Sequence, residues 1–105
     1  MLGWGGFVLV ALEGNRAVIT ALGVLPARRR LGAGAKLIGA AVKECRRRGC
    51  SHVTCETRAG NLAPQNLLIE AGFRVVGLWA RYYADDEAAV AFELRLRRPR
   101  PTGPA

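Results

Sequence analysis

The sequence is poor in the residues that build metal and disulfide sites. It has one histidine, His52, and three cysteines, Cys45, Cys50 and Cys55, among 105 residues. The cysteines stand five residues apart, no CxxC pair occurs, and their odd count does not suit a disulfide framework. The pattern therefore predicts no metal site and cysteines that act as small core or strand residues, and it fits a reducing cytoplasm.

Acidic residues and long apolar runs are also scarce. Eight Asp and Glu residues stand against sixteen Lys and Arg residues, so the formal net charge is +8. Such a balance suits polyanionic partners: nucleic acid, phosphorylated cofactors or acidic membranes. The apolar start lacks a basic flank and is too short to cross a bilayer, so no membrane segment is predicted. Few aromatic residues accompany the arginines, which ranks a nucleic-acid partner last.

Apolar periodicity and turn signals predict an α/β (α+β) fold. Two β-prone runs at 7–12 and 17–24, joined by a turn with Gly and Asn, predict a hairpin. Amphipathic spacing predicts a helix over 33–48, which Gly49 would end. The remaining predicted elements are a strand at 51–57, a helix at 62–71 capped by Asn61, and strands at 73–80 and 88–96. The order β-β-α-β-α-β-β predicts a mixed, mostly antiparallel sheet with one parallel βαβ crossover.

The length allows one domain, predicted to span residues 1–96. A chain of this size buries a modest core, so its stability is expected to be marginal. The basic, proline-rich tail at 97–105 is predicted to be disordered.

The segment from Val24 to Gly34 leaves a strand, passes three arginines and two glycines, and enters a helix. The first N–H groups of a helix have no intrahelical partner, and the helix dipole adds positive charge there. Gly32 and Gly34 place no Cβ between the backbone and a bound oxyanion. The GxxxxGK[ST] pattern is absent, and GxGxxG fails because position 37 is leucine where that pattern needs its last glycine. The segment predicts a diphosphate site; the alternative is a flexible connection with solvated arginines.

At this point the sequence resembles the GNAT superfamily of N-acetyltransferases. Residues 29–34 (RRLGAG) are similar to the family signature of Gln or Arg, two residues, Gly, one residue, and Gly or Ala. Residues 56–61 (ETRAGN) and 70–73 (EAGF) resemble the family's fifth strand and fourth helix, and 81–83 (RYY) resembles the loop between its last strands. The spacing is similar to that of ribosomal-protein-alanine N-acetyltransferases, and the resemblance covers roughly 7–96.

The resemblance implies transfer of an acetyl group from the co-substrate acetyl-CoA to an amine acceptor, either a small molecule or a protein N-terminus. It implies that the cofactor lies between two strands that splay apart. The implied cofactor-binding residues are Leu22, Gly23, Val24, Arg29, Arg30, Leu31, Gly32, Ala33, Gly34, Ala35 and Asn61. Tyr82 and Tyr83 match positions that line the acceptor-peptide side.

Glu56 matches the family's general base, which often acts through water. Attack on a thioester requires a neutral amine. An α-amine with a pKa of ~8 needs only about 1.4 kcal/mol for deprotonation at pH 7, whereas lysine needs about 4–5 kcal/mol. A weak base is therefore enough for an α-amine. The alternative for Glu56 is a strand glutamate paired with Arg58 or Arg74.

Two departures from the family bear on activity. Leu68 stands where the family places a tyrosine that protonates the leaving thiolate. Water, Tyr82 or Tyr83 could replace that acid, and loss of a general acid typically lowers the rate by about 10²–10⁴-fold. The other alternative is that the chain is a non-catalytic acyl-CoA-binding or regulatory module. The family's first strand, first two helices and second strand also lack counterparts. The expectation is a truncated domain, with a homodimer as the hypothesis for how the acceptor wall is completed.

Overall fold

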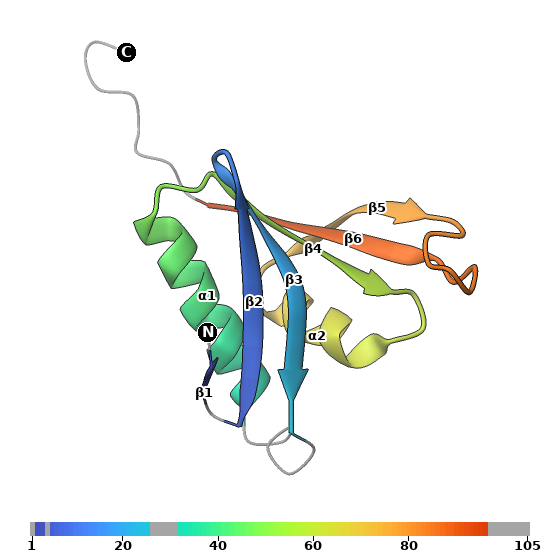
Figure 1. The fold of residues 1–105 in the computed structure, drawn as a ribbon, viewed down its shortest axis with the longest axis horizontal. Helices are drawn as coiled ribbons and strands as arrows, with labels where there is room; N and C mark the ends of the chain where they lie inside the picture. Colours follow the sequence, from blue (N-terminus) through green and yellow to red (C-terminus); the bar gives the residue numbers. More distant parts are fainter. Residues whose placement is uncertain (1, 4, 26–31, 97–105) are drawn as a thin grey trace.

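A computed structural model describes residues 2–3, 5–25 and 32–96 (Figure 1). The elements are β1 (Leu2–Gly3), β2 (Gly6–Glu13), β3 (Arg16–Val24), α1 (Ala33–Arg47), β4 (His52–Arg58), α2 (Leu62–Glu70), β5 (Arg74–Trp79) and β6 (Ala89–Arg95). The predicted tail at 97–105 lies outside the described residues. Of the described helices, none is both long and apolar enough to cross a membrane.

The strands form one sheet in the order β1-β2-β3-β4-β6-β5. Among the described strand pairs, β3 and β4 run parallel and the other four are antiparallel. The predicted mixed sheet with one parallel crossover, and its element order, are therefore confirmed. The structure adds β1, a two-residue strand that pairs with Gly6 and Phe7 at the outer edge of β2.

The β2–β3 hairpin turns through Gly14 and Asn15, as the sequence predicts. Gly14 has a φ of 64°, a backbone conformation that suits glycine at the first central position of a tight hairpin turn. Glu13 and Arg16 close the turn as a register pair and form an ion pair of 2.8 Å. This turn fixes which face of each strand meets the helices.

Both helices pack on the same face of the sheet, behind β2 and β3 as Figure 1 is drawn. One cluster of buried side chains joins Leu37 and Ile38 of α1, Leu68 of α2, Val53 of β4 and Phe92 of β6. Each of these five is at most 1% exposed. The alternation of side chains along β4 and β6 therefore divides the strands into a covered face and a face that neither described helix covers.

Truncation of Leu37 tests this core. Leu37 is 0% exposed, whereas Leu62, also in a helix, is 63% exposed. We expect Leu37→Ala to lower the free energy of unfolding by about 2–5 kcal/mol, because it removes buried methyl groups and leaves a cavity. Leu62→Ala should change it by about 0.5 kcal/mol or less. Urea denaturation measures both, and equal losses would contradict the placement of α1.

Candidate active site

The central feature of the sheet is a slot between β3 and β4. The two strands pair over only four residues, from Arg16–His52 to Ile19–Cys55. Beyond that point β3 continues with β2 as its partner, and β4 continues with β6 (Figure 1). Thr20 is an extra residue in β3, since Ile19 pairs with Val10 and Ala21 with Leu9. Such a bulge bends a strand, and here it lies where the parallel strands separate.

The slot is an open cleft of about 210 Å³. A second cleft of about 380 Å³, here called the groove, shares Leu22, Asn61 and Pro64 with it. The groove is lined by the end of β3, including Gly23 and Val24, by the first turn of α1, and by α2. Slot and groove therefore make one elongated depression that runs from between the strands to the start of α1.

The start of α1 supplies the anion-binding end of the groove. Gly32 is the N-cap residue with a φ of 77°, and no side chain in the described part of the chain caps the helix. The first-turn residues Ala33, Gly34 and Ala35 thus carry N–H groups without intrahelical partners, at the positive end of the helix dipole. Arg29, Arg30 and Leu31 lie outside the described residues.

Gly32 and Gly34 have different structural roles. A Cβ on Gly32 would meet nothing within 4 Å, so its positive φ is the feature that favours glycine there. A Cβ on Gly34 would lie 2.6 Å from Leu67 Cδ1, because α1 and α2 touch at this point. The sequence predicts the same role beside an anion for both glycines, and in the structure Gly34 also lies where α1 packs closely against Leu67 of α2.

Glu56 lies at the opposite side of the slot. Its neighbours Cys55 and Thr57 are buried, whereas Glu56 is exposed on the face that neither helix covers. The Tyr82 hydroxyl donates a hydrogen bond of 2.6 Å to Glu56 Oε1. This bond and the charge of Glu56 raise the pKa of Tyr82, so the phenol keeps its proton at neutral pH. In the described residues no ion pair joins Glu56 to Arg58 or Arg74.

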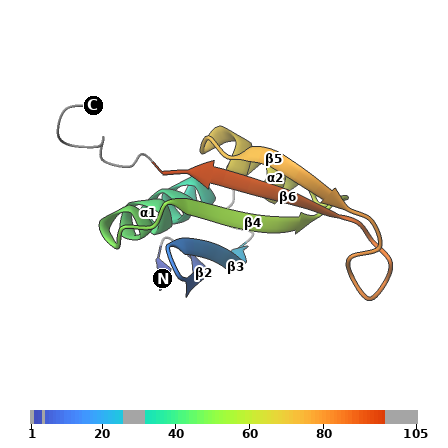
Figure 2. The same cartoon turned by 90° about the horizontal axis from the view of Figure 1, so that it is seen from above.

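The loop between β5 and β6 brings both predicted acceptor-side tyrosines to the slot. It projects at the end of the sheet where β4 finishes (Figure 2). Tyr83 lines the slot, and partial burial raises the pKa of its phenol. Tyr82 and Tyr83 contact each other edge to face, with ring centroids 5.1 Å apart. The structure therefore brings Tyr82 and Tyr83 close to Glu56 and Asn61, which precede them by more than 20 positions in the sequence.

Three further side chains line the slot on its helix side. Leu68 is 1% exposed and offers no proton donor. Burial and, to a smaller extent, Glu56 raise the pKa of Cys55 to about 11, so its thiol is protonated at neutral pH and is a poor nucleophile. Thr57 Oγ1 is buried without a hydrogen-bond partner among the described residues. Such a hydroxyl in a slot lining suits a polar ligand group, and sequence reasoning missed it.

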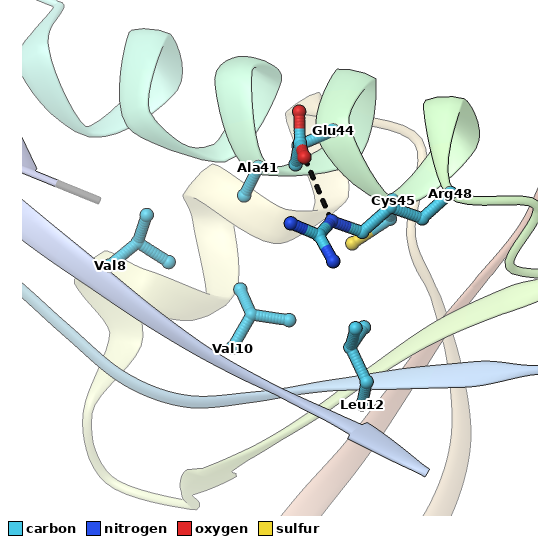
Figure 3. A pocket seen from close by; sticks show the side chains of 7 residues that line it. All are labelled: Val8, Val10, Leu12, Ala41, Glu44, Cys45 and Arg48. Atoms are coloured by element: carbon cyan, nitrogen blue, oxygen red, sulfur yellow. Dashed lines mark hydrogen bonds and ion pairs between the residues drawn. The ribbon is translucent and has the colours of Figure 1, made fainter. Parts of the chain in front are cut away.

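A separate cleft of about 270 Å³ lies between β2 and α1 (Figure 3). It shares no lining residue with the slot or the groove. Its charged side chains, Glu44 and Arg48, form an ion pair of 2.8 Å at the rim, and burial raises the pKa of the Cys45 thiol. Glu44 and Arg48 are paired with each other and the Cys45 thiol is protonated, so this cleft offers no free reactive group. The slot is therefore the candidate active site. No metal-binding group of three or more His, Cys, Asp or Glu side chains occurs within residues 2–3, 5–25 and 32–96.

A mixed sheet split over a helix N-terminus is the fold of known acetyltransferases. The ribosomal-protein-S18-alanine N-acetyltransferase of Escherichia coli superimposes with a TM-score of 0.82 at 26% identity, over 90% of this chain and 63% of that chain. A chain of the NatC complex, solved with Gag peptide and CoA, superimposes with a TM-score of 0.77 at 28% identity, over 86% of this chain and 58% of that chain. A nourseothricin acetyltransferase superimposes with a TM-score of 0.81 at 29% identity, over 87% of this chain and 57% of that chain.

The model of the acetyltransferase (GNAT) family matches residues 1–73. The chain belongs to this family, as its resemblance indicated. It spans less than two thirds of the length of the three solved structures above. No curated protein matches it in sequence.

Proposed function

We propose that this chain binds acetyl-CoA in the groove and slot and transfers the acetyl group to a primary amine. The observation that carries the proposal is the slot itself. Together with the groove, it runs from the N-terminus of α1, which no described side chain caps, to the carboxylate of Glu56, which accepts a hydrogen bond from the Tyr82 phenol. The likeness to a chain of a complex solved with CoA supports the cofactor, because the two chains share the fold.

The cofactor is proposed to lie along the end of β3. No described strand pairs with the β4-facing edge of β3 beyond Ile19, so backbone groups at Leu22 and Gly23 can bond to the pantetheine arm. Val24, which lines the groove, is proposed to contact the same arm. The diphosphate would meet Gly32, Ala33, Gly34 and Ala35, together with the preceding Arg29, Arg30 and Leu31. Asn61 lines both clefts and is proposed to contact the pantetheine.

The acceptor amine is proposed to enter from the open face of the sheet, where Glu56 and the tyrosines lie. The amine attacks the thioester carbon, and the new C–N bond replaces the C–S bond as the tetrahedral intermediate collapses. Glu56, directly or through water, takes the proton that the nitrogen loses. The departing thiolate receives a proton from water or from Tyr82, since Leu68 has none to give. Positioning of the two reactants supplies much of the rate.

The favoured acceptor is a protein N-terminal α-amine. A single exposed carboxylate is a weak base, and an α-amine needs a far smaller free energy for deprotonation than a lysine. A mass-spectrometric assay with acetyl-CoA tests this. It compares a peptide with a free N-terminus against the same peptide N-blocked and carrying one lysine. We expect acetylation of the free N-terminus to be faster. Equal rates would contradict the α-amine preference, and no turnover with any amine would contradict transfer.

A second candidate is a non-catalytic acyl-CoA-binding module. Leu68 favours it, because that buried side chain occupies the slot where the family has its acid tyrosine. Binding of acetyl-CoA without turnover in the same assay is the result that this candidate predicts.

A homodimer and a cytoplasmic location stay proposals. Phe7 and Leu9 of β2 are 37% and 50% exposed on the face without helices, which is apolar surface that a second copy could cover. Light scattering coupled to size-exclusion chromatography distinguishes a dimer from a stable monomer.

A further inference from the structure

The two tyrosines beside the slot lie in the loop between β5 and β6, which contains two non-glycine residues with left-handed backbone. The loop links Trp79 to Ala89, and its inner turn is closed by a hydrogen bond from the Asp86 N–H to the Tyr83 carbonyl at 2.8 Å. Arg81 and Asp86 have φ values of 53° and 68°. Left-handed backbone at residues other than glycine is costly and persists only where surrounding contacts impose it.

Several side-chain contacts of this loop converge on one residue, Arg58, at the end of β4. Arg58 Nη1 donates hydrogen bonds to both carboxylate oxygens of Asp85, at 3.0 and 2.9 Å, and to Glu87 Oε1, at 2.9 Å. The same guanidinium lies over the Tyr83 ring, with its central carbon 4.1 Å from the ring centroid. One cation thus contacts three residues of the loop, which are 25, 27 and 29 positions away in the sequence.

Glu87 links Arg58 to the backbone of both tyrosines. Its backbone carbonyl accepts hydrogen bonds from the N–H groups of Tyr82 and Tyr83, both at 3.1 Å. Its Oε2 accepts a hydrogen bond of 3.0 Å from the Gly60 N–H, at the start of the turn into α2. Bonds from Arg58 and Gly60 hold the pKa of Glu87 below its usual range, so it is a carboxylate at neutral pH.

We propose that Arg58 is a positioning residue that fixes the β5–β6 loop on the slot, so that Tyr82 stays bonded to Glu56 and Tyr83 forms the slot wall. The catalytic consequence rests on the proposed function, whereas the placement of the loop does not. The guanidinium suits this role because it engages two carboxylates and stacks on a ring at once. Its side chain is 43% exposed, and exposed ion pairs add little to overall stability. Its effect should therefore be local.

The first test uses the fact that the chain has two tyrosines, both in this loop. NMR spectra of the full chain labelled with ¹³C at tyrosine Cζ contain two protein signals, one for each. In the wild type we expect two separate signals displaced from that of free tyrosine, because Tyr82 bonds to a carboxylate and Tyr83 lies under a cation. Arg58→Gln should move both toward the free-tyrosine position. Unchanged signals in a folded variant would overturn the proposal.

Arg47→Gln is the matched control. Arg47 also donates two hydrogen bonds to a carboxylate, that of Glu44, but at the far end of α1. It should leave both tyrosine signals unchanged. Arg58→Lys keeps the charge but not the planar guanidinium that lies over the Tyr83 ring, so we expect it to restore the signals only in part. Full restoration by lysine would contradict the role of the guanidinium shape, and a shift caused by Arg47→Gln would show that the signals report global changes.

The second test is kinetic and uses the acceptor peptide of the assay above. We expect Arg58→Gln to lower kcat/KM for the acceptor by about 10–100-fold, because misplaced reacting groups lose that much rate. The KM for acetyl-CoA should change by a smaller factor than kcat/KM for the acceptor, because Arg58 lines the slot but not the groove, where most of the cofactor is proposed to bind. Equal changes in both would indicate a general structural defect and overturn the positioning role. If the wild type has no turnover, the proposed function fails, while the tyrosine signals still decide whether Arg58 holds the loop.

Discussion

Replacing Glu56 by Gln should lower kcat for the acceptor amine by about 10²–10⁴-fold while the affinity for acetyl-CoA stays unchanged. The amide keeps the shape of the carboxylate and an oxygen that can accept the Tyr82 hydrogen bond. It cannot take a proton from the attacking nitrogen. Steady-state kinetics with varied acceptor measure kcat, and calorimetric titration of the variant with acetyl-CoA measures the affinity for the cofactor.

The loss should shrink as the pH rises. Above the α-amine pKa of ~8 most of the acceptor is already neutral, so a base has less to do. Glu93→Gln is the matched control, because Glu93 lies on the neighbouring strand β6, opposite Thr54, and does not line the slot. A defect of equal size in both variants, or a Glu56→Gln enzyme with normal kcat at pH 7, would remove Glu56 from the mechanism.

Ala63→Trp should weaken acetyl-CoA binding by about 100-fold or more. Ala63 is an exposed residue in the first turn of α2 and lines the groove, so an indole there would occupy the space proposed for the cofactor. A ligand in such a cleft buries most of its surface there, so blocking the cleft removes most of its contacts with the protein. Because the native residue is exposed, the substitution should leave the core intact.

Ala71→Trp makes the same chemical change at the other end of α2. Ala71 is exposed, is the C-cap residue of the helix, and lines neither the slot nor the groove. In calorimetric titrations, Ala71→Trp should bind acetyl-CoA normally, whereas Ala63→Trp should show no binding at acetyl-CoA concentrations near the wild-type Kd. Normal binding by both would place the cofactor somewhere other than the groove.

Local patterns predicted the elements well where one physical signal dominated. The helix at 33–48 was clear from its apolar spacing and from Gly49, which has a φ of 80° in the structure. By contrast, β1 has two residues, too few to show any alternation. Asn61 stands at the N-cap position of α2 as predicted, but its side chain makes no capping bond; Gln65 instead donates to the Arg58 and Ala59 carbonyls and holds the turn.

The sequence predicted candidate residues for the site but not their contacts. The family resemblance indicated Glu56, Tyr82 and Tyr83, yet their interactions depend on the path of the β5–β6 loop. The sequence offers Arg58 as an ion-pair partner for Glu56, whereas in the structure Arg58 forms hydrogen bonds to Asp85 and Glu87, more than 25 positions away. Pairs so distant leave no periodic trace in a single sequence. The bulge at Thr20 and the unpartnered hydroxyl of Thr57 are likewise products of tertiary pairing.

Calorimetric titration of the chain with acetyl-CoA tests the central claim most directly, with a parallel titration of inorganic phosphate as the control for simple charge attraction to a basic protein. Cofactor binding in the slot and groove predicts saturable binding of one acetyl-CoA per chain, while phosphate at the same concentration gives little heat. A folded chain that binds no acetyl-CoA, or that binds phosphate equally well, would contradict an acetyl-CoA site in this structure.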